Sequence, residues 1–398
     1  MSGALHPLLL AALWISAVPA VAACAYLLGL TVLSGALPLP APSRRQLCFD
    51  VIIPAHNEES VIARVIGSLK RLDWPPDRYQ VIVVADNCTD ATAAIAGQAG
   101  AQVLQRHDTE RRGKGYALDY AFKASAGRAW ADAVVVIDAD AEVSPNLLEA
   151  FARRIEQGEQ AVQAHYGVSN PAASWRTRLL TIAKAAFHIV RSRARERLKV
   201  SCGIRGNGWA VTRALLARVP YRAFSLTEDL EYGIELGLAG CRVAYADEAH
   251  SNAEMVSTEK DSRQQRRRWE HGRFQLIRSS TLPLLRAALR ARSGICLDLA
   301  LDLMVLPLSY LALNVALLVV LAIVGVTNGR EFEPWLLVGV GCLAALALHI
   351  LRGWQLSGVG ARGLLDLARA PFFLLWKILV MFGRRTSGEW VRTKRENR

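Results

Sequence analysis

The chain has 398 residues, of which 52% are hydrophobic, and its 48 Lys and Arg against 35 Asp and Glu give a net charge of +13. This combination excludes a disordered chain, which lacks such apolar content, and an ordinary soluble protein. The apolar residues are unevenly distributed along the chain, so we expect one soluble domain between membrane segments.

The amino-terminal segment is almost free of charge. No acidic or basic side chain other than His6 occurs in residues 2–43, and the apolar run 8–33 is long enough for a tilted transmembrane helix. A cleaved signal peptide is the alternative, because the residues before Cys24 resemble a lipoprotein cleavage box. No basic region precedes the run and it continues past Cys24, so we expect residues 1–43 to form a retained transmembrane helix.

Further apolar stretches lie towards the carboxyl terminus. Residues 304–326 are uncharged and contain Pro307, a residue type tolerated within lipid-embedded helices. Residues 335–351 are shorter and a marginal candidate for a third span. Residues 282–292 and 371–382 mix apolar and basic side chains, which favours helices lying in the membrane interface. We therefore expect interfacial helices, two transmembrane helices and a basic cytoplasmic tail in residues 281–398.

The distribution of basic residues predicts the orientation. Arg44 and Arg45 follow the first span, and residues 352–398 contain ten Lys and Arg, whereas the loop 327–334 has one Arg and two Glu. The positive-inside rule then predicts a multi-pass inner-membrane protein with a cytoplasmic central domain and tail and an external amino terminus. The basic excess would face membrane lipids rather than nucleic acid, although a soluble basic surface is an alternative for the tail.

The central region, residues 44–280, alternates β-branched runs with helical stretches. This alternation predicts an α/β fold with a mostly parallel sheet and helices on both faces. In such sheets ligands bind beyond the carboxyl ends of the strands, and acidic side chains follow three of the expected strands here. Those expected strands are residues 50–54, 81–85, 102–105 and 134–137.

Asp138 and Asp140 stand two residues apart at the end of an expected strand. An extended backbone would direct both carboxylates to one face. Adjacent carboxylates repel each other unless a cation joins them, and oxygen ligands favour Mg²⁺ or Mn²⁺, which in turn hold phosphate oxygens. A turn or a helix cap is the alternative for the pair alone, but its position beside two other acidic strand ends favours a metal site.

Two neighbouring features also have alternative explanations. Asn57 could cap a helix that starts near Glu58 rather than contact a ligand. The sequence from Arg112 to Gly115 forms a flexible cationic loop suited to a diphosphate, although it lacks the Walker pattern and could be a solvated basic turn.

Six motifs in chain order resemble the family 2 glycosyltransferases, specifically the membrane-integrated inverting enzymes of GT-A fold that make cell-surface polysaccharides. The resemblance covers about residues 49 to 280, and each motif alone is weak. The motifs are Pro54-Ala-His-Asn-Glu58, Asp86, Gly113-Lys114-Gly115, Asp138-Ala-Asp140, Thr227-Glu-Asp229 and Gln265-Arg-Arg-Arg-Trp269.

The resemblance implies a role for each motif. Asp140, with Asp138, would coordinate Mg²⁺ or Mn²⁺, and Asp229, beside Glu228, would take the proton from the acceptor hydroxyl. A single in-line displacement of this kind inverts the anomeric centre. The residues implied in nucleotide-sugar binding are Pro54, Asn57, Glu58, Asp86, Lys114 and Asp138, and those implied at the diphosphate and acceptor are Gln265, Arg268 and Trp269.

Two of these assignments have structural alternatives. Ser225 and Glu228 fit a capping box for a helix ending near Gly240, and a helix amino terminus would lower the pKa of Asp229 and make it a weaker base. Gln265, Arg268 and Trp269 would share one face of a helix over residues 262–280, where Trp269 could instead anchor the membrane boundary.

The function implied is transfer of a sugar from a nucleotide sugar, with UDP favoured by the resemblance, to a lipid-linked or polysaccharide acceptor at the cytoplasmic membrane face. Three spans offer little material for a channel, so an export partner or a homo-oligomer could form the conduit. A nucleotide-sugar sensor without turnover and a nucleotidyltransferase are the alternatives. The basic stretch 174–197 could lie along the membrane surface, and His250 is expected to be structural rather than a metal ligand.

Overall fold

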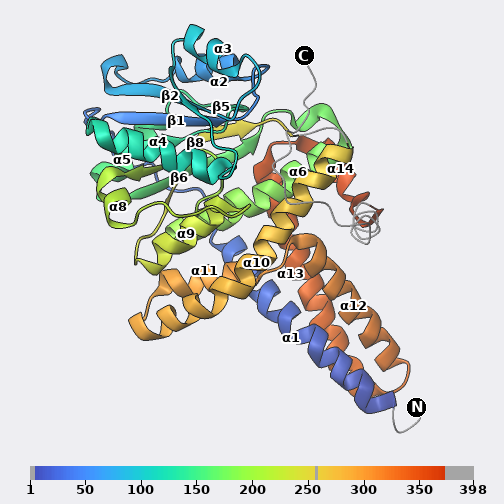
Figure 1. The fold of residues 1–398 in the computed structure, drawn as a ribbon. Helices are drawn as coiled ribbons and strands as arrows, with labels where there is room; N and C mark the ends of the chain where they lie inside the picture. Colours follow the sequence, from blue (N-terminus) through green and yellow to red (C-terminus); the bar gives the residue numbers. More distant parts are fainter. Residues whose placement is uncertain (1–4, 256–258, 373–398) are drawn as a thin grey trace.

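The computed structural model describes residues 5–255 and 259–372, with side chains for residues 6–255 and 270–372. Figure 1 shows a sheet-containing domain from which three long helices project together. Most of the expected interfacial segment 371–382 and the basic tail lie outside the described residues.

One mixed sheet of eight strands forms the centre of the soluble domain, in the order β3-β2-β1-β4-β7-β6-β8-β5. The half from β3 to β4 is parallel and contains all four strands expected from the sequence. In the other half β6 and β8 pair in parallel, but β7 and β5 run antiparallel to their neighbours, so the sheet is less parallel than expected. The strands are β1 Phe49–Ala55, β2 Tyr79–Asp86, β3 Gln102–Arg106, β4 Ala133–Val136, β5 Ala141–Val143, β6 Ala161–Val168, β7 Trp209–Thr212 and β8 Ala244–Ala253.

Helices cover both faces of the sheet and bury a separate apolar core on each. Two cores are required because apolar side chains of β1 point to both faces. Val51 and Ile53 face one core and Ile52 faces the other, because successive side chains of a strand point to opposite sides. The first core is closed by α2 (Ile62–Leu69), α3 (Thr92–Gln98) and α5 (Leu147–Glu156). The second is closed by α4 (Lys114–Arg128), α8 (Arg213–Arg218) and α9 (Glu228–Leu238).

Among the described residues, three helices are long and apolar enough to cross a membrane, and they pack together through a third apolar core. Pro307 is the N-cap of its helix rather than an internal residue, because its ring lacks the N–H that a helix interior requires. The third helix is 25 residues long, so the 17 apolar residues seen in the sequence underestimate it. These helices are α1 (Leu5–Val32), α12 (Leu308–Val326) and α13 (Glu333–Ser357).

Two helical segments connect the sheet to the candidate spans (Figure 1). The expected interfacial helix 282–292 is the end of a longer helix, α10 (Glu259–Ala291), on which α11 (Gly294–Met304) folds back. The basic stretch forms α6 (Trp175–Ala185), a π-helical segment (Ala186–Val190) and α7 (Arg191–Arg197). Arg178, Arg191 and Arg193 of this stretch bind protein carboxylates, and the stretch joins the sheet domain to α13 and to α14 (Gly360–Leu367).

Candidate active site

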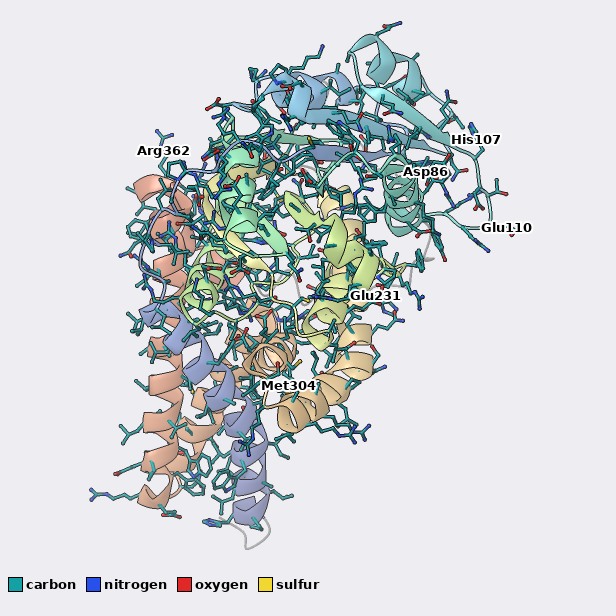
Figure 2. All side chains as sticks on the ribbon, turned by 90° about the vertical axis from the view of Figure 1, so that its left-hand side faces the viewer. Asp86, His107, Glu110, Glu231, Met304 and Arg362 are labelled. Atoms are coloured by element: carbon teal, nitrogen blue, oxygen red, sulfur yellow. The ribbon has the colours of Figure 1, made fainter. Side chains whose placement is uncertain are left out.

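A cavity of about 1440 Å³ lies beyond the carboxyl ends of β1 and β4 and extends to the start of α12. Its polar end is lined by Glu58, Lys114, Asp138, Asp140, Glu228 and Asp229. Figure 2 marks the surroundings: Asp86 lies inside the fold, His107 and Glu110 lie at its edge, and Met304 lies where the domain meets the candidate spans. The cavity therefore brings together acidic residues that follow β1 and β4 with those at the start of α9, and Asp86 at the end of β2 directly precedes the cavity-lining Asn87.

Asp86 ends β2 and is fully buried. Its Oδ1 accepts a hydrogen bond from Arg106 Nη1 at 2.6 Å and a weaker one from Asn87 at 3.2 Å. Its Oδ2 is buried without a hydrogen-bond partner within the described part of the chain. Asn87, the next residue, lines the cavity. An acceptor atom left open beside a cavity fits a ligand N–H such as that of a nucleobase.

The loop after β1 carries Pro54, Asn57 and Glu58, and all three line the cavity. Asn57 has φ 56°, a left-handed conformation that asparagine tolerates, and its Oδ1 accepts the backbone N–H of Thr89 at 2.8 Å. The side chain thus joins the loops that follow β1 and β2. The capping alternative for Asn57 is wrong, because α2 begins only at Ile62, with Val61 at its N-cap.

Asp138 and Asp140 both line the cavity, but they do so from a turn rather than from an extended strand. The backbone N–H of Ala141 donates to the carbonyl of Asp138 at 3.1 Å, and the N–H of Asp138 donates to Asn207 Oδ1 at 3.0 Å. The expected extended geometry is therefore wrong, although both residues line the same cavity. The turn supplies only two carboxylates, and the described residues contain no group of three or more metal-ligating side chains.

Lys114 opens α4 and connects the two acidic groups. Its Nζ lies 2.7 Å from Asp138 Oδ1 and 3.4 Å from Glu228 Oε1, and it donates to the carbonyl of Gly206 at 2.7 Å. Burial alone would lower the pKa of Lys114, but the two carboxylates outweigh it and raise this pKa, so the amine stays charged.

Glycines on either side allow Lys114 to reach this position. Gly113 has φ 132°, which a side chain would strain. A Cβ at Gly115 would lie 2.3 Å from the carbonyl oxygen of Ala223, so any larger residue would push the start of α4 away from that backbone. The Gly-Lys-Gly sequence therefore packs a cation closely against the site, which explains the motif better than flexibility does.

Glu228 and Asp229 form the first turn of α9, whose N-cap is Thr227. The expected capping box is wrong, because the backbone N–H of Ser225 donates to Glu231 at 3.0 Å instead of to Glu228. The expected pKa change of Asp229 is also reversed. Burial raises the pKa of both carboxyls, and attraction to Lys114 offsets this only in part. A raised pKa makes Asp229 a stronger base than a solvated aspartate.

Helix α10 passes directly over this turn. A Cβ at Gly272 would lie 2.6 Å from Thr227 Cγ2, so a glycine is required where the two elements meet. Gln265, Arg268 and Trp269 belong to the same helix, but their side chains lie outside the described residues. The structure thus describes the backbone that carries this motif and leaves the assignment of its side chains as a prediction.

Comparison with known proteins identifies the family. A sequence family described as glycosyltransferase like family 2 matches residues 46–272, more than half of the chain. The chain belongs to the family 2 glycosyltransferases. This glycosyltransferase has the GT-A-like fold expected from its motifs: a mannosyltransferase of Pyrobaculum calidifontis, solved with GDP-mannose and Mn²⁺, superposes with a TM-score of 0.51 at 20% identity and covers 85% of this chain and 98% of that chain.

The names of curated relatives of this glycosyltransferase indicate different acceptors. A beta-monoglucosyldiacylglycerol synthase of Synechocystis sp. is 32% identical over 240 residues, which is 58% of this chain and 48% of the relative. A probable glucomannan 4-beta-mannosyltransferase of Arabidopsis thaliana is 24% identical over 247 residues, which is 59% of this chain and 46% of the relative. The match spans about half the length of these relatives.

The sequence analysis missed two candidate functional residues of this glycosyltransferase, Arg106 and Lys184. Arg106, which binds Asp86, follows a predicted strand and could have been found by the rule that such positions face the ligand. Lys184 lines the cavity with a buried Nζ 3.6 Å from the centre of the Tyr166 ring, and burial lowers its pKa to about 8 although Asp140 and Asp138 oppose this. His250, by contrast, is not among the cavity-lining residues.

Proposed function

We propose that this glycosyltransferase transfers a sugar from a nucleotide diphosphate sugar to a hydroxyl of a membrane-embedded acceptor, with inversion of the anomeric centre. The observation that carries the proposal is one continuous cavity, which has five carboxylates and Lys114 at one end and the start of α12 at the other. UDP-sugars are our first candidate donors, and GDP-mannose is the second because it is bound by the mannosyltransferase of the same fold.

In this proposal the cavity residues have separate roles in donor binding and catalysis. Asp86 Oδ2 accepts an N–H of the nucleobase, and Pro54, Asn57 and Glu58 line the nucleotide side of the cavity. Lys114, held by Asp138, offsets negative charge on the diphosphate. Asp229 takes the proton of the acceptor hydroxyl as its oxygen attacks the anomeric carbon, and the nucleotide diphosphate leaves with the electron pair. Glu228 keeps Lys114 in place.

A divalent metal ion fits this site if the substrate completes its coordination. Asp138 and Asp140 would hold Mg²⁺ or Mn²⁺, and diphosphate oxygens and water would supply the other ligands, as is usual for Mg²⁺. Such an ion, when bound, supplies charge stabilisation to the leaving diphosphate. The mannosyltransferase of the same fold was solved with Mn²⁺, which supports a divalent ion here.

The acceptor side of the proposal rests on the membrane helices. Leu306, Leu308 and Ile350 line the far end of the cavity and belong to segments at or within candidate spans. A lipid-linked acceptor could therefore keep its tail in the membrane while its hydroxyl reaches Asp229. We propose the inner membrane as the location and the cytoplasmic face as the side of catalysis, because nucleotide sugars are charged and the domain follows Arg44 and Arg45. A growing polysaccharide is the second acceptor, supported by the glucomannan-synthesising relative.

A donor panel tests the function. Purified protein in nanodiscs is given UDP-glucose, UDP-galactose, UDP-N-acetylglucosamine or GDP-mannose with Mn²⁺ and a total membrane lipid extract. Nucleotide diphosphate release is measured together with the mass of new glycolipids, and an Asp229→Asn variant is the inactive control. Release of nucleotide diphosphate with one new product supports the proposal. Release of pyrophosphate would indicate a nucleotidyltransferase, and binding of every donor without release would indicate a sensor.

A further inference from the structure

A second charged group lines the same cavity, between its carboxylate end and its apolar end. Arg191, Arg205 and Arg273 come from α7, from the loop before β7 and from α10, and all three line the cavity. They meet at Asp302 of α11. Arg191 Nη1 lies 3.0 Å from Asp302 Oδ1, Arg205 Nη1 lies 3.7 Å from Asp302 Oδ2, and Arg273 donates to the carbonyl of Asp302 at 2.6 Å.

This arginine cluster carries more positive charge than its carboxylates neutralise. Arg195 also joins it and binds both Asp298, at 3.0 Å, and Asp302, at 2.8 Å. Four guanidinium groups thus share two carboxylates, and within the described part of the chain two positive charges have no carboxylate of their own. Burial without pairing is costly for a charged group, so the imbalance calls for an anion that is absent from the protein itself.

Unused hydrogen-bond donors belong to the cavity-lining members of the cluster. Arg205, whose side chain is 4% exposed, has buried Nε and Nη2 atoms without hydrogen-bond partners among the described residues. Arg191 and Arg273 each have such an Nε atom. Burial, together with the neighbouring arginines, lowers the pKa of Arg205 and lowers that of Arg273 to about 10, which is the electrostatic sign of crowded cations.

The cluster lies next to the reaction centre. Gly206 follows Arg205; its carbonyl accepts the hydrogen bond of Lys114, and a Cβ at Gly206 would lie 3.1 Å from Asp229 Oδ2. On the other side the cavity wall continues through Val305 and Leu306 into α12. The arginines therefore connect the cavity wall beside Asp229 with the wall at the start of α12, where Arg273 donates to the carbonyl of Val305 at 2.9 Å.

We propose that the arginine cluster binds a phosphate group of the acceptor, so that the acceptor is an anionic lipid whose phosphate lies between its apolar tail and the hydroxyl that receives the sugar. Planar guanidinium groups bind phosphate oxygens through paired, charge-assisted hydrogen bonds. The phosphate would be held at Arg205, Arg191 and Arg273 while the hydroxyl beyond it reaches Asp229. The inference rests on the proposed transferase function and specifies its acceptor.

The bonds that change are those of the transferase reaction. The acceptor hydroxyl oxygen forms the bond to the anomeric carbon, the bond from that carbon to the diphosphate oxygen breaks, and Asp229 receives the proton. The acceptor phosphate keeps all its bonds and serves only to position the lipid. A neutral acceptor, such as the diacylglycerol named for the Synechocystis relative, would leave the two positive charges without a partner.

The test compares a matched pair of short lipids. Protein in dodecyl maltoside micelles is titrated calorimetrically with dihexanoyl phosphatidylglycerol, which has a phosphate and free hydroxyls, and with dihexanoylglycerol, its neutral counterpart. A third titration uses UDP with Mn²⁺, because the donor diphosphate is the other source of phosphate. The variants are Arg205→Gln and Arg273→Gln, and the control is Arg278→Gln, which removes the same charge from an exposed position on α10.

We expect wild-type protein to bind the phosphatidylglycerol more tightly than the neutral lipid. Arg205→Gln and Arg273→Gln should each weaken that binding about tenfold or more and leave the UDP titration unchanged, whereas Arg278→Gln should alter neither. Equal wild-type affinity for the two lipids would overturn the proposal without any variant. So would a loss of UDP affinity instead of lipid affinity in Arg205→Gln. Donor hydrolysis is measured on the same preparation: its complete absence would refute the transferase function, whereas normal hydrolysis without selective lipid binding refutes this inference alone.

Discussion

Replacing Asp229 by asparagine tests whether this carboxylate acts as the general base or only supports the start of α9. Asparagine keeps the shape of the side chain at the start of α9 but cannot accept the proton of the acceptor. Sugar transfer should fall about 100-fold or more, the usual effect of removing a general base. Donor binding should change little, because the close carboxylate partners of Lys114 are Asp138 and Glu228.

The stability of the Asp229→Asn variant follows from two opposing effects. The variant loses the favourable interaction of a carboxylate with a helix amino terminus, which is worth about 0.3–1 kcal/mol. It also removes a charge that burial disfavours, as the raised pKa of Asp229 indicates. The free energy of unfolding should therefore change by no more than about 1 kcal/mol in either direction.

One preparation of each variant supplies the three measurements: transfer rate with labelled donor, UDP affinity by calorimetry, and unfolding temperature. Glu228→Gln is the matched comparison, because it makes the same chemical change one residue earlier and removes a partner of Lys114 at 3.4 Å. It should weaken donor binding more than Asp229→Asn does. Near-normal transfer by Asp229→Asn with reduced stability would refute the assignment of Asp229 as the base.

Four further results are expected. Asp140→Ala should abolish transfer and weaken donor binding in Mn²⁺ while the protein remains folded, and activity that survives EDTA would contradict the metal role. Gly115→Ala should lower stability and donor affinity, because its Cβ would lie 2.3 Å from a backbone oxygen, whereas Gly127→Ala, with free space on the same helix, should not. An impermeant thiol reagent should label Asn328→Cys from outside intact cells and miss Glu110→Cys, with wild-type protein as the background. The transfer rate should fall on acidification at a pH above the ordinary aspartate range, because a base with a raised pKa becomes protonated at a higher pH. An acid limb of the pH–rate profile near pH 4 would contradict this.

The sequence predicted the parallel half of the sheet because β1, β2 and β4 are short, largely buried apolar runs that polar residues terminate, and because the partly exposed edge strand β3 continues the alternation of strands and helices. The remaining strands were missed for physical reasons. β8 contains Asp247, Glu248 and His250, so it lacks the continuous apolar run of a central strand. β5 is three residues long and β7 only four, and their pairing depends on partners more than forty residues away.

The candidate site was predictable where a local motif carries it and unpredictable where distant residues meet. Strand ends and the Thr-Glu-Asp motif indicated the polar end of the cavity, although the turn at Asp138 and the raised pKa of Asp229 required the folded environment. No local pattern reveals that Arg205 and Asp302 are neighbours, since nearly a hundred residues separate them. Arg352 illustrates the same limit in the membrane region: its charge ends the apolar run, yet it binds Ser34 at 2.9 Å and α13 continues to Ser357.

Polar contacts fix the distance between the reaction centre and the candidate spans. Tyr26 of α1 donates to Asp298 at 2.8 Å, and Arg197 of α7 donates to the carbonyls of Leu33 and Ala36, each at 2.9 Å. The first bond joins the first candidate span to α11, and the other two join the residues that follow this span to α7, which also carries the cavity-lining Arg191. Because the domain is attached this way, an acceptor tail held in the membrane sets how far its hydroxyl can extend towards Asp229. Acceptor selectivity should then depend on the length between tail and hydroxyl as well as on charge, so a headgroup too short to pass Arg205 would bind without receiving a sugar.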